Sequence, residues 1–193
     1  MDIGGLSYDF IVGVGSTFAT ILIFRWLIKP KIKFSKDVRV IKPKSGKYSY
    51  IIIIRNDSKY RTLIDVRIRC RLHVKNILNK NTGVWNIYDM VTTFNDSLVF
   101  KNGDRRIQFS AEDSENFVNG RIYKNIIEKY GEEFIYIPYI FLEYKDAYLK
   151  FYVIGNDRFT GFRHIYESQK YFSFNFNKGT WRKSELERSV SSN

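Results

Sequence analysis

The sequence predicts a mainly β protein that begins with one transmembrane helix, and three observations support this. Residues 10–24 contain no charged side chain, and the segment Tyr8–Ile28 is long enough, at about 1.5 Å per residue, to cross a hydrocarbon core. Residues 63–74 alternate between apolar and polar side chains, which is the period of a β-strand. Aromatic residues reach 17% of the chain and prolines number only 3, so a packed β-rich core is expected.

The apolar segment fits a membrane helix better than the two alternatives. A signal peptide begins with basic residues, whereas Asp2 and Asp9 are the only charges in residues 1–9. A buried helix of a soluble domain would show a polar face, and here the only polar side chains between residues 10 and 24 are Ser16, Thr17 and Thr20. Small residues four apart let membrane helices approach closely, which predicts a homo-oligomer through Gly13, Gly15, Thr17 and Ala19.

The charges predict the orientation of this helix. Residues 25–47 carry a dense run of lysines and arginines and one acid, Asp37, and such a cluster marks the cytoplasmic side of a span. We therefore expect a cell-membrane protein with residues 1–7 outside, a helix over 8–28, a basic linker over 29–36, a cytosolic ligand-sensing domain over 37–181 and a polar tail over 182–193. The single cysteine, Cys70, agrees with a reducing compartment because it allows no internal disulfide.

The cytosolic part is expected to form an antiparallel β-barrel or sandwich of about eight to ten strands with one packed helix. Ile51–Ile54 fit a strand covered on both faces. In the next strand Ile64, Val66, Ile68, Cys70, Leu72 and Val74 share one face. The expected elements, in order, are strands at 38–42 and 48–55, a strand at 63–74, a hairpin over 98–109 that turns at Asn102-Gly103, a helix from Ser114 to Tyr130 that ends at Gly131, a hairpin of strands 134–143 and 148–154, and one or two strands in 162–176.

The chain offers little for catalysis. Neither His73 nor His164 has neighbours at metal-ligand spacing, and no nucleophile elbow or phosphate-binding loop is present. Cys70 falls on the apolar face of its strand, where a core residue is expected rather than a nucleophile. We therefore expect no enzyme, no catalytic residue, no metal and no cofactor.

Arginines predict an anion site. Arg67, Arg69 and Arg71 share one strand face at about 7 Å spacing, which suits bidentate contacts with phosphate, although a solvated outer face is the simpler interpretation. The net charge of +12 would also fit a nucleic-acid polymer, but much of the excess lies next to the expected membrane helix, so a membrane is favoured. The expected ligand-binding residues are Arg67, Arg69, Arg71, Tyr88, Arg105 and Arg163.

Residues 27–73 resemble the start of the cytoplasmic domain of inward-rectifier potassium channels. The resemblance rests on Lys29-Pro30-Lys31, residues 34–38, Gly46-Lys47, residues 54–56 and residues 65–69, with a looser match over 134–171. In that family the basic linker contacts anionic lipid, which implies headgroup contacts for Lys29, Lys31 and Lys33. The pore helix, selectivity filter and outer helix of the family have no counterpart in this sequence.

The overall plan is also similar to that of the membrane effectors of bacterial CBASS antiphage systems. In those proteins a β-barrel binds a cyclic nucleotide, and the membrane segments then assemble and disrupt the inner membrane. The resemblance implies an antiviral effector whose partners are the lipid bilayer, a cyclic nucleotide or other anionic ligand, and further copies of itself. The alternative is a single-pass membrane protein whose inward-rectifier-like domain binds lipid or acts as a scaffold.

Overall fold

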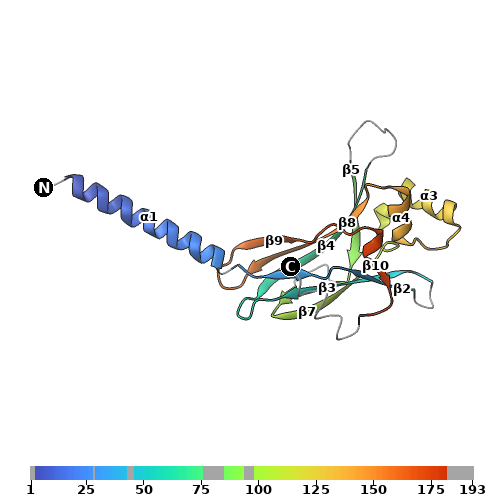
Figure 1. Ribbon diagram of the computed structural model, residues 1–193, viewed down its shortest axis with the longest axis horizontal. Helices are drawn as coiled ribbons and strands as arrows, with labels where there is room; N and C mark the ends of the chain where they lie inside the picture. Colours follow the sequence, from blue (N-terminus) through green and yellow to red (C-terminus); the bar gives the residue numbers. More distant parts are fainter. Residues whose placement is uncertain (1–2, 28, 43–45, 76–84, 94–97, 182–193) are drawn as a thin grey trace.

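The computed structural model describes residues 3–27, 29–42, 46–75, 85–93 and 98–181. Ten strands in these ranges form one sheet that curls into a half-barrel (Figure 1), so the prediction of a mainly β fold is confirmed. The sheet order is β10-β2-β3-β7-β5-β4-β8-β9, with β1 beside β3 and β6 beside β4. The strands are β1 (Ile32–Phe34), β2 (Val38–Ile41), β3 (Ser49–Asn56), β4 (Leu63–Lys75), β5 (Trp85–Thr92), β6 (Leu98–Phe100), β7 (Gly103–Ser110), β8 (Tyr148–Asp157), β9 (Arg163–Glu167) and β10 (Phe176–Lys178).

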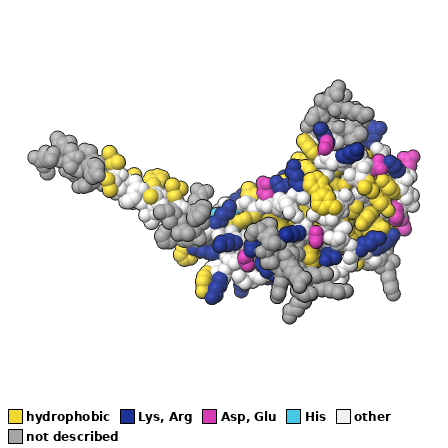
Figure 2. Space-filling view, viewed as in Figure 1, with side chains coloured by type: hydrophobic (Ala, Val, Ile, Leu, Met, Phe, Trp, Pro, Cys, Tyr) yellow, Lys and Arg dark blue, Asp and Glu magenta, His cyan; other side chains and the backbone are white. Residues whose placement is uncertain are grey.

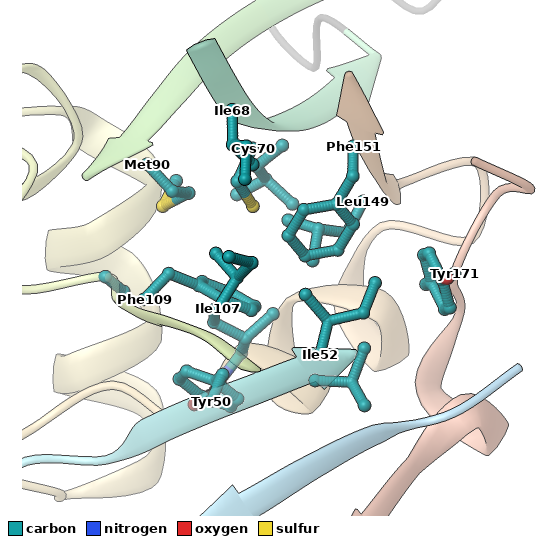
Figure 3. Close-up of a cluster of buried hydrophobic side chains, with 14 of the residues drawn as sticks. Tyr50, Ile52, Ile68, Cys70, Met90, Ile107, Phe109, Leu149, Phe151 and Tyr171 are labelled. Atoms are coloured by element: carbon teal, nitrogen blue, oxygen red, sulfur yellow. Dashed lines mark hydrogen bonds between the residues drawn. The ribbon is translucent and has the colours of Figure 1, made fainter. Parts of the chain in front are cut away.

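The core lies on the concave side of this sheet (Figure 3). Ile52 of β3 and Ile107 of β7 are fully buried there, opposite Cys70 of β4. Phe109 packs edge-on against Phe151 of β8, with 5.3 Å between the ring centroids. The strands therefore meet through aromatic and β-branched side chains, as their composition predicts.

Strand β4 confirms the alternation but not its full extent. Ile68, Cys70 and Leu72 point into the core, and Arg67 and Arg69 are exposed. The pairing with β8 shifts between Ile64 and Arg67, because a bulge at Asp65, with φ of 51°, adds one residue to β4. As a result Leu63 is buried in place of Ile64, which corrects the predicted inward face at this end of the strand.

Two expected hairpins are wrong. Residues 98–100 form β6, which pairs with β4, while β7 pairs with β3 and β5, so the turn at Asn102-Gly103 joins strands that are not neighbours. The segment expected as a strand over 134–143 contains helix α4 (Ile137–Glu143). Its apolar residues Ile137, Ile140 and Phe141 recur at helical spacing, and Pro138 lies in the first turn, where proline is tolerated.

The helix expected from Ser114 to Tyr130 is divided. Helix α2 (Glu115–Val118) ends before Gly120, and α3 (Arg121–Tyr130) follows and ends, as predicted, at Gly131 in the left-handed conformation. The Ser114 hydroxyl does not cap α2, because it donates to the Asp89 carbonyl at 2.6 Å. A short 3₁₀ turn, η1 (Ser173–Asn175), precedes β10. The expected polar tail, 182–193, and residues 1–2 lie outside the described residues.

Helix α1 (Ile3–Leu27) is the first element and projects away from the sheet (Figure 1). In the part of the chain that the structure describes, no helix has both the length and the apolar character required to cross a membrane. The transmembrane helix predicted over Tyr8–Ile28 is therefore not confirmed. The predicted span extends at both ends beyond the described side chains of α1, which run from Phe10 to Leu22.

Candidate functional site

The described part of α1 exposes an apolar surface. Large hydrophobic side chains here are between 42% and 72% exposed. The hydroxyls of Ser16, Thr17 and Thr20 donate to helix carbonyls three or four residues earlier, at 2.7–2.9 Å. These hydroxyl protons therefore have hydrogen-bond acceptors within the helix and do not require water. The exposed hydrophobic residues are Phe10, Ile11, Val12, Val14, Phe18, Ile21 and Leu22.

The small residues predicted to bring copies together lie in the same helix. A side chain added at Gly13 or Gly15 would meet nothing within 4 Å, so the chain itself does not fill the space beside them. Gly13 and Thr17 are also joined by the bond from the Thr17 hydroxyl to the Gly13 carbonyl, at 2.8 Å. The predicted oligomer contact through Gly13, Gly15, Thr17 and Ala19 stays a prediction.

The sheet end next to α1 brings two loops together. We call the helix-proximal end the segments 57–62 and 157–162 together with residues 29–33, which lead from α1 into β1. The Lys31 amide donates to the Ser58 hydroxyl at 2.6 Å, and the Asp57 amide donates to the Lys31 carbonyl at 2.8 Å. The Arg158 amide donates to the Thr62 carbonyl at 2.9 Å, which joins the loops to each other.

The helix-proximal end displays aromatic rings beside cations. Tyr60 is 83% exposed, Phe159 79% and Phe162 47%. The Lys59 ammonium lies 5.3 Å from the Tyr60 ring centroid, and the Arg61 guanidinium lies 4.5 Å from that of Phe159. Figure 2 shows hydrophobic and basic side chains gathered where α1 meets the domain. Exposed aromatic side chains interleaved with bases are typical of surfaces that face a membrane interface.

The lysines predicted to meet lipid headgroups belong to this end but differ in their surroundings. Lys29 and Lys31 are exposed, and the Lys29 ammonium lies 5.3 Å from the Tyr166 ring centroid. Lys33 is half-buried and forms an ion pair with Asp57 at 2.9 Å. The pairing satisfies the charge of Lys33 within the domain, so Lys29 and Lys31 are the better placed for an external anion.

Arg67 and Arg163, two of the predicted ligand residues, line one small pocket of about 170 Å³ on the outer face of the sheet. The bulge at Asp65 lies close to Gly155: a side chain added there would lie 3.1 Å from a Val66 methyl carbon and 3.3 Å from the Ile64 carbonyl oxygen, so β4 and β8 approach tightly at this point. The pocket is lined by Asp65, Arg67, Ile154, Gly155, Asn156 and Arg163.

The charges of this pocket favour an anion. Its two arginines outnumber its one acid, and the Asn156 amide donates to the Asp65 carboxylate at 3.3 Å. Among the described residues, the ion pairs of the neighbouring strands include Arg71 and Lys150 but neither Arg67 nor Arg163. A guanidinium fork that no carboxylate holds is able to bind phosphate in a bidentate manner.

The other predicted ligand residues do not join this pocket. Arg69 and Arg71 lie further along the same face, and the Arg71 side chain already binds Asp89 at 2.8 Å. Tyr88 faces the opposite, inner side, where its ring contacts Phe117 with a centroid distance of 5.2 Å. Arg105 lies on β7, paired with Ile54 of β3. Of the six predicted ligand residues, the structure therefore brings only Arg67 and Arg163 together in one pocket. A ligand-binding role for any of the six stays a prediction.

Sequence reasoning missed the residues that shape this end of the molecule. Asn156 and Gly155 line the pocket where β8 lies against the bulge in β4. The available signal was Gly155 itself, because an isolated glycine inside a strand pattern indicates a bulge or a close approach of two backbones. The loops could have been found: Lys59-Tyr60-Arg61 and Arg158-Phe159 alternate basic and aromatic residues between strands.

Cys70 and His73 are both buried in the β domain. No group of three or more metal-binding side chains is found in the described ranges. Burial raises the pKa of the Cys70 thiol well above its usual value, which disfavours the thiolate. His73 stacks on Tyr148 with 4.6 Å between the ring centroids, and burial, with Arg71 nearby, lowers its pKa.

No family model and no curated protein matches the sequence. Neither resemblance in the sequence gains support or opposition from these comparisons.

Proposed function

We propose that this chain is a membrane-associated protein in which α1 inserts its apolar side chains into the bilayer and the helix-proximal end rests on anionic headgroups. The observation that carries the proposal is the exposed apolar surface of α1. Removing a large apolar side chain from water contributes about 1.5–3 kcal/mol. The seven exposed hydrophobic residues between Phe10 and Leu22 therefore favour transfer into lipid by roughly 10 kcal/mol or more.

The rest of the molecule supports the same placement. The bases and aromatic rings of the helix-proximal end lie where α1 meets the domain, which is where headgroups would lie if α1 is in the membrane. Each base near an anionic leaflet contributes about 1 kcal/mol. In its finer form, the proposal has α1 crossing the cell membrane with its first residues outside and the β domain in the cytosol, the orientation that the charges predict.

Flotation with lipid vesicles tests this proposal. The full chain is mixed with phosphatidylcholine vesicles containing or lacking phosphatidylserine and is then centrifuged through a density gradient. We expect flotation that resists alkaline carbonate and that strengthens with phosphatidylserine at low salt. A chain that stays at the bottom of the gradient with both vesicles contradicts insertion.

Labelling of a single cysteine tests the finer form. Cys70 is fully buried, so a cysteine introduced at Ser7 is the reactive one in the folded protein. In right-side-out cells, a membrane-impermeant maleimide should label Ser7→Cys without lysis. Labelling that requires lysis contradicts a crossing helix with an outside N-terminus.

A second candidate function is anion sensing, and the pocket of Arg67 and Arg163 favours it. In this proposal a phosphate-bearing ligand, such as the cyclic nucleotide implied by the antiphage resemblance, binds the pocket and shifts the protein toward an assembled state. The ligand can do this only as far as it binds that state more tightly. The alternative, a lipid-binding or scaffolding module, requires no such ligand.

Leakage of dye from vesicles separates these two functions. An effector should release the dye only when a cyclic nucleotide is added, and Arg67→Glu with Arg163→Glu should abolish the release. Arg69→Glu, on the same face outside the pocket, is the matched control. Leakage that is absent with every cyclic nucleotide tested, or unchanged by the double substitution, contradicts the sensing function and leaves the membrane proposal standing.

A further inference from the structure

A second, larger pocket lies away from the helix-proximal end. Its volume is about 340 Å³, within the range of small-molecule sites, and we call it the tyrosine pocket. Strands β2 and β10 line one side of it, and α4, its N-cap residue Tyr136 and the residue that precedes β3, Tyr48, line the other. It is lined by Val40, Ile41, Lys42, Tyr48, Tyr136, Tyr139, Lys178 and Gly179.

Three half-buried tyrosines make this pocket aromatic. Tyr48 and Tyr136 have ring centroids 5.0 Å apart, and Tyr136 meets Tyr139 edge-on at 5.1 Å. Tyr139 in turn stacks flat on Tyr130 at 4.0 Å, which fixes its ring from behind. Because the planes of Tyr48 and Tyr139 are tilted by 42° and 82° to that of Tyr136, a planar group can stack on one ring and meet the edges of the others, at little cost in side-chain freedom.

Two lysines give the pocket its charge. The Lys42 ammonium donates to the Tyr48 hydroxyl at 3.2 Å and lies 3.6 Å from the Glu132 carboxylate, so its charge is partly used. Lys178 is exposed and has no ion-pair partner among the described residues. An anionic group would therefore be placed at Lys178, with Lys42 as the more distant cation.

We propose that the tyrosine pocket binds a small planar aromatic anion of the nucleoside monophosphate class. The ring would stack on the tyrosines, and the anionic group would lie at Lys178. This site is independent of the proposed membrane function, because none of its lining residues belongs to α1 or to the helix-proximal end. It also differs from the pocket of Arg67 and Arg163, which is half as large and has no aromatic lining.

Titration calorimetry on the full chain, with AMP, adenosine and ribose 5-phosphate as probes, tests the proposal. We expect AMP to bind at least tenfold more tightly than either fragment, because only AMP carries both the ring and the anion. Lys178→Glu should weaken AMP binding at least tenfold. The matched control is Lys101→Glu, an exposed lysine outside both pockets, which should change the affinity less than twofold.

A second substitution tests the aromatic wall. Tyr139→Leu should weaken AMP but leave ribose 5-phosphate unchanged, and thermal unfolding checks that the variant is folded. If this variant does not fold, the Lys178→Glu variant and the three probes still test whether the tyrosine pocket binds AMP. The proposal is overturned if AMP gives no binding, if ribose 5-phosphate binds as well as AMP, or if Arg67→Glu rather than Lys178→Glu removes AMP binding. Flotation with vesicles is unaffected by any of these results.

Discussion

A charge placed in the middle of the exposed apolar stretch is the sharpest test of membrane insertion. Phe18 lies in the middle part of α1 and is 65% exposed, so replacing it disturbs no core contact. An ionised aspartate at the centre of a membrane helix costs about 2.5–3.5 kcal/mol. On the same membrane-insertion scale, which gives smaller values than transfer from water, the lost phenylalanine adds about 0.3–0.6 kcal/mol. Phe18→Asp should therefore lower the partition of the full chain into vesicles by roughly 10²- to 10³-fold, at about 1.4 kcal/mol per factor of ten.

The measurement is the bound fraction against lipid concentration, by flotation with phosphatidylcholine vesicles. The matched control is Phe174→Asp, because Phe174 is 76% exposed but lies in η1 of the β domain. It should change partition less than twofold. If Phe18→Asp and Phe174→Asp partition alike, lipid does not cover α1 and the reasoning is refuted. A wild-type chain that forms a discrete oligomer in water and does not partition would instead indicate that copies of α1 cover one another.

Three further predictions concern the β domain, each measured by urea unfolding. Tyr50→Phe should destabilise by about 1–3 kcal/mol, because the buried hydroxyl accepts from the Ile137 amide at 2.8 Å and donates to the Ile135 carbonyl; an unchanged midpoint would contradict this. Gly155→Ala should lower the free energy of unfolding by about 1–3 kcal/mol, because the added methyl group would crowd Val66. Gly161→Ala places its methyl group in open space at a φ of 71°, so it measures the cost of backbone strain separately. Because the pKa of His73 is lowered on folding, the unfolded chain binds the proton first, and stability should fall as the pH drops below about 6.5. His73→Phe, which keeps the stack on Tyr148, should reduce that fall, and an identical pH profile would contradict it.

The sequence predicts the strands best where one period extends over many residues. Ile68, Cys70 and Leu72 are buried, and Arg67 and Arg69 exposed, because nothing interrupts the period of two. The segment Ile51–Ile54 is covered on both faces, as predicted, because Trp181 packs on Ile53 from the outside.

The sequence predicts the elements less well where helix and strand periods are both present, or where a strand pairs with one that is distant in the sequence. Residues 134–143 are rich in aromatic and β-branched side chains, which favour a strand. However, Ile137, Ile140 and Phe141 lie on one face of a helix, and because that face is buried the segment forms α4. The pairing of β6 with β4 joins residues more than thirty apart, which an Asn-Gly turn cannot reveal. The pocket of Arg67 and Arg163 could not be predicted for the same reason. Arg67 lies on β4 and Arg163 on β9, and these strands come close only because β8 lies between them in the sheet.

The parallel pair of β10 and β2 affects how the protein is made. Phe176 of β10 lies beside Val38 of β2, so the sheet that the structure describes is complete only when β10 has been synthesised. Helix α1 ends at Leu27, about 150 residues earlier. At about 5–20 residues per second, translation of these residues takes roughly 8–30 s, during which α1 has no finished domain behind it. The nascent apolar helix thus meets its surroundings well before the β domain folds, and a partner that covers α1 can bind it while the chain is still on the ribosome.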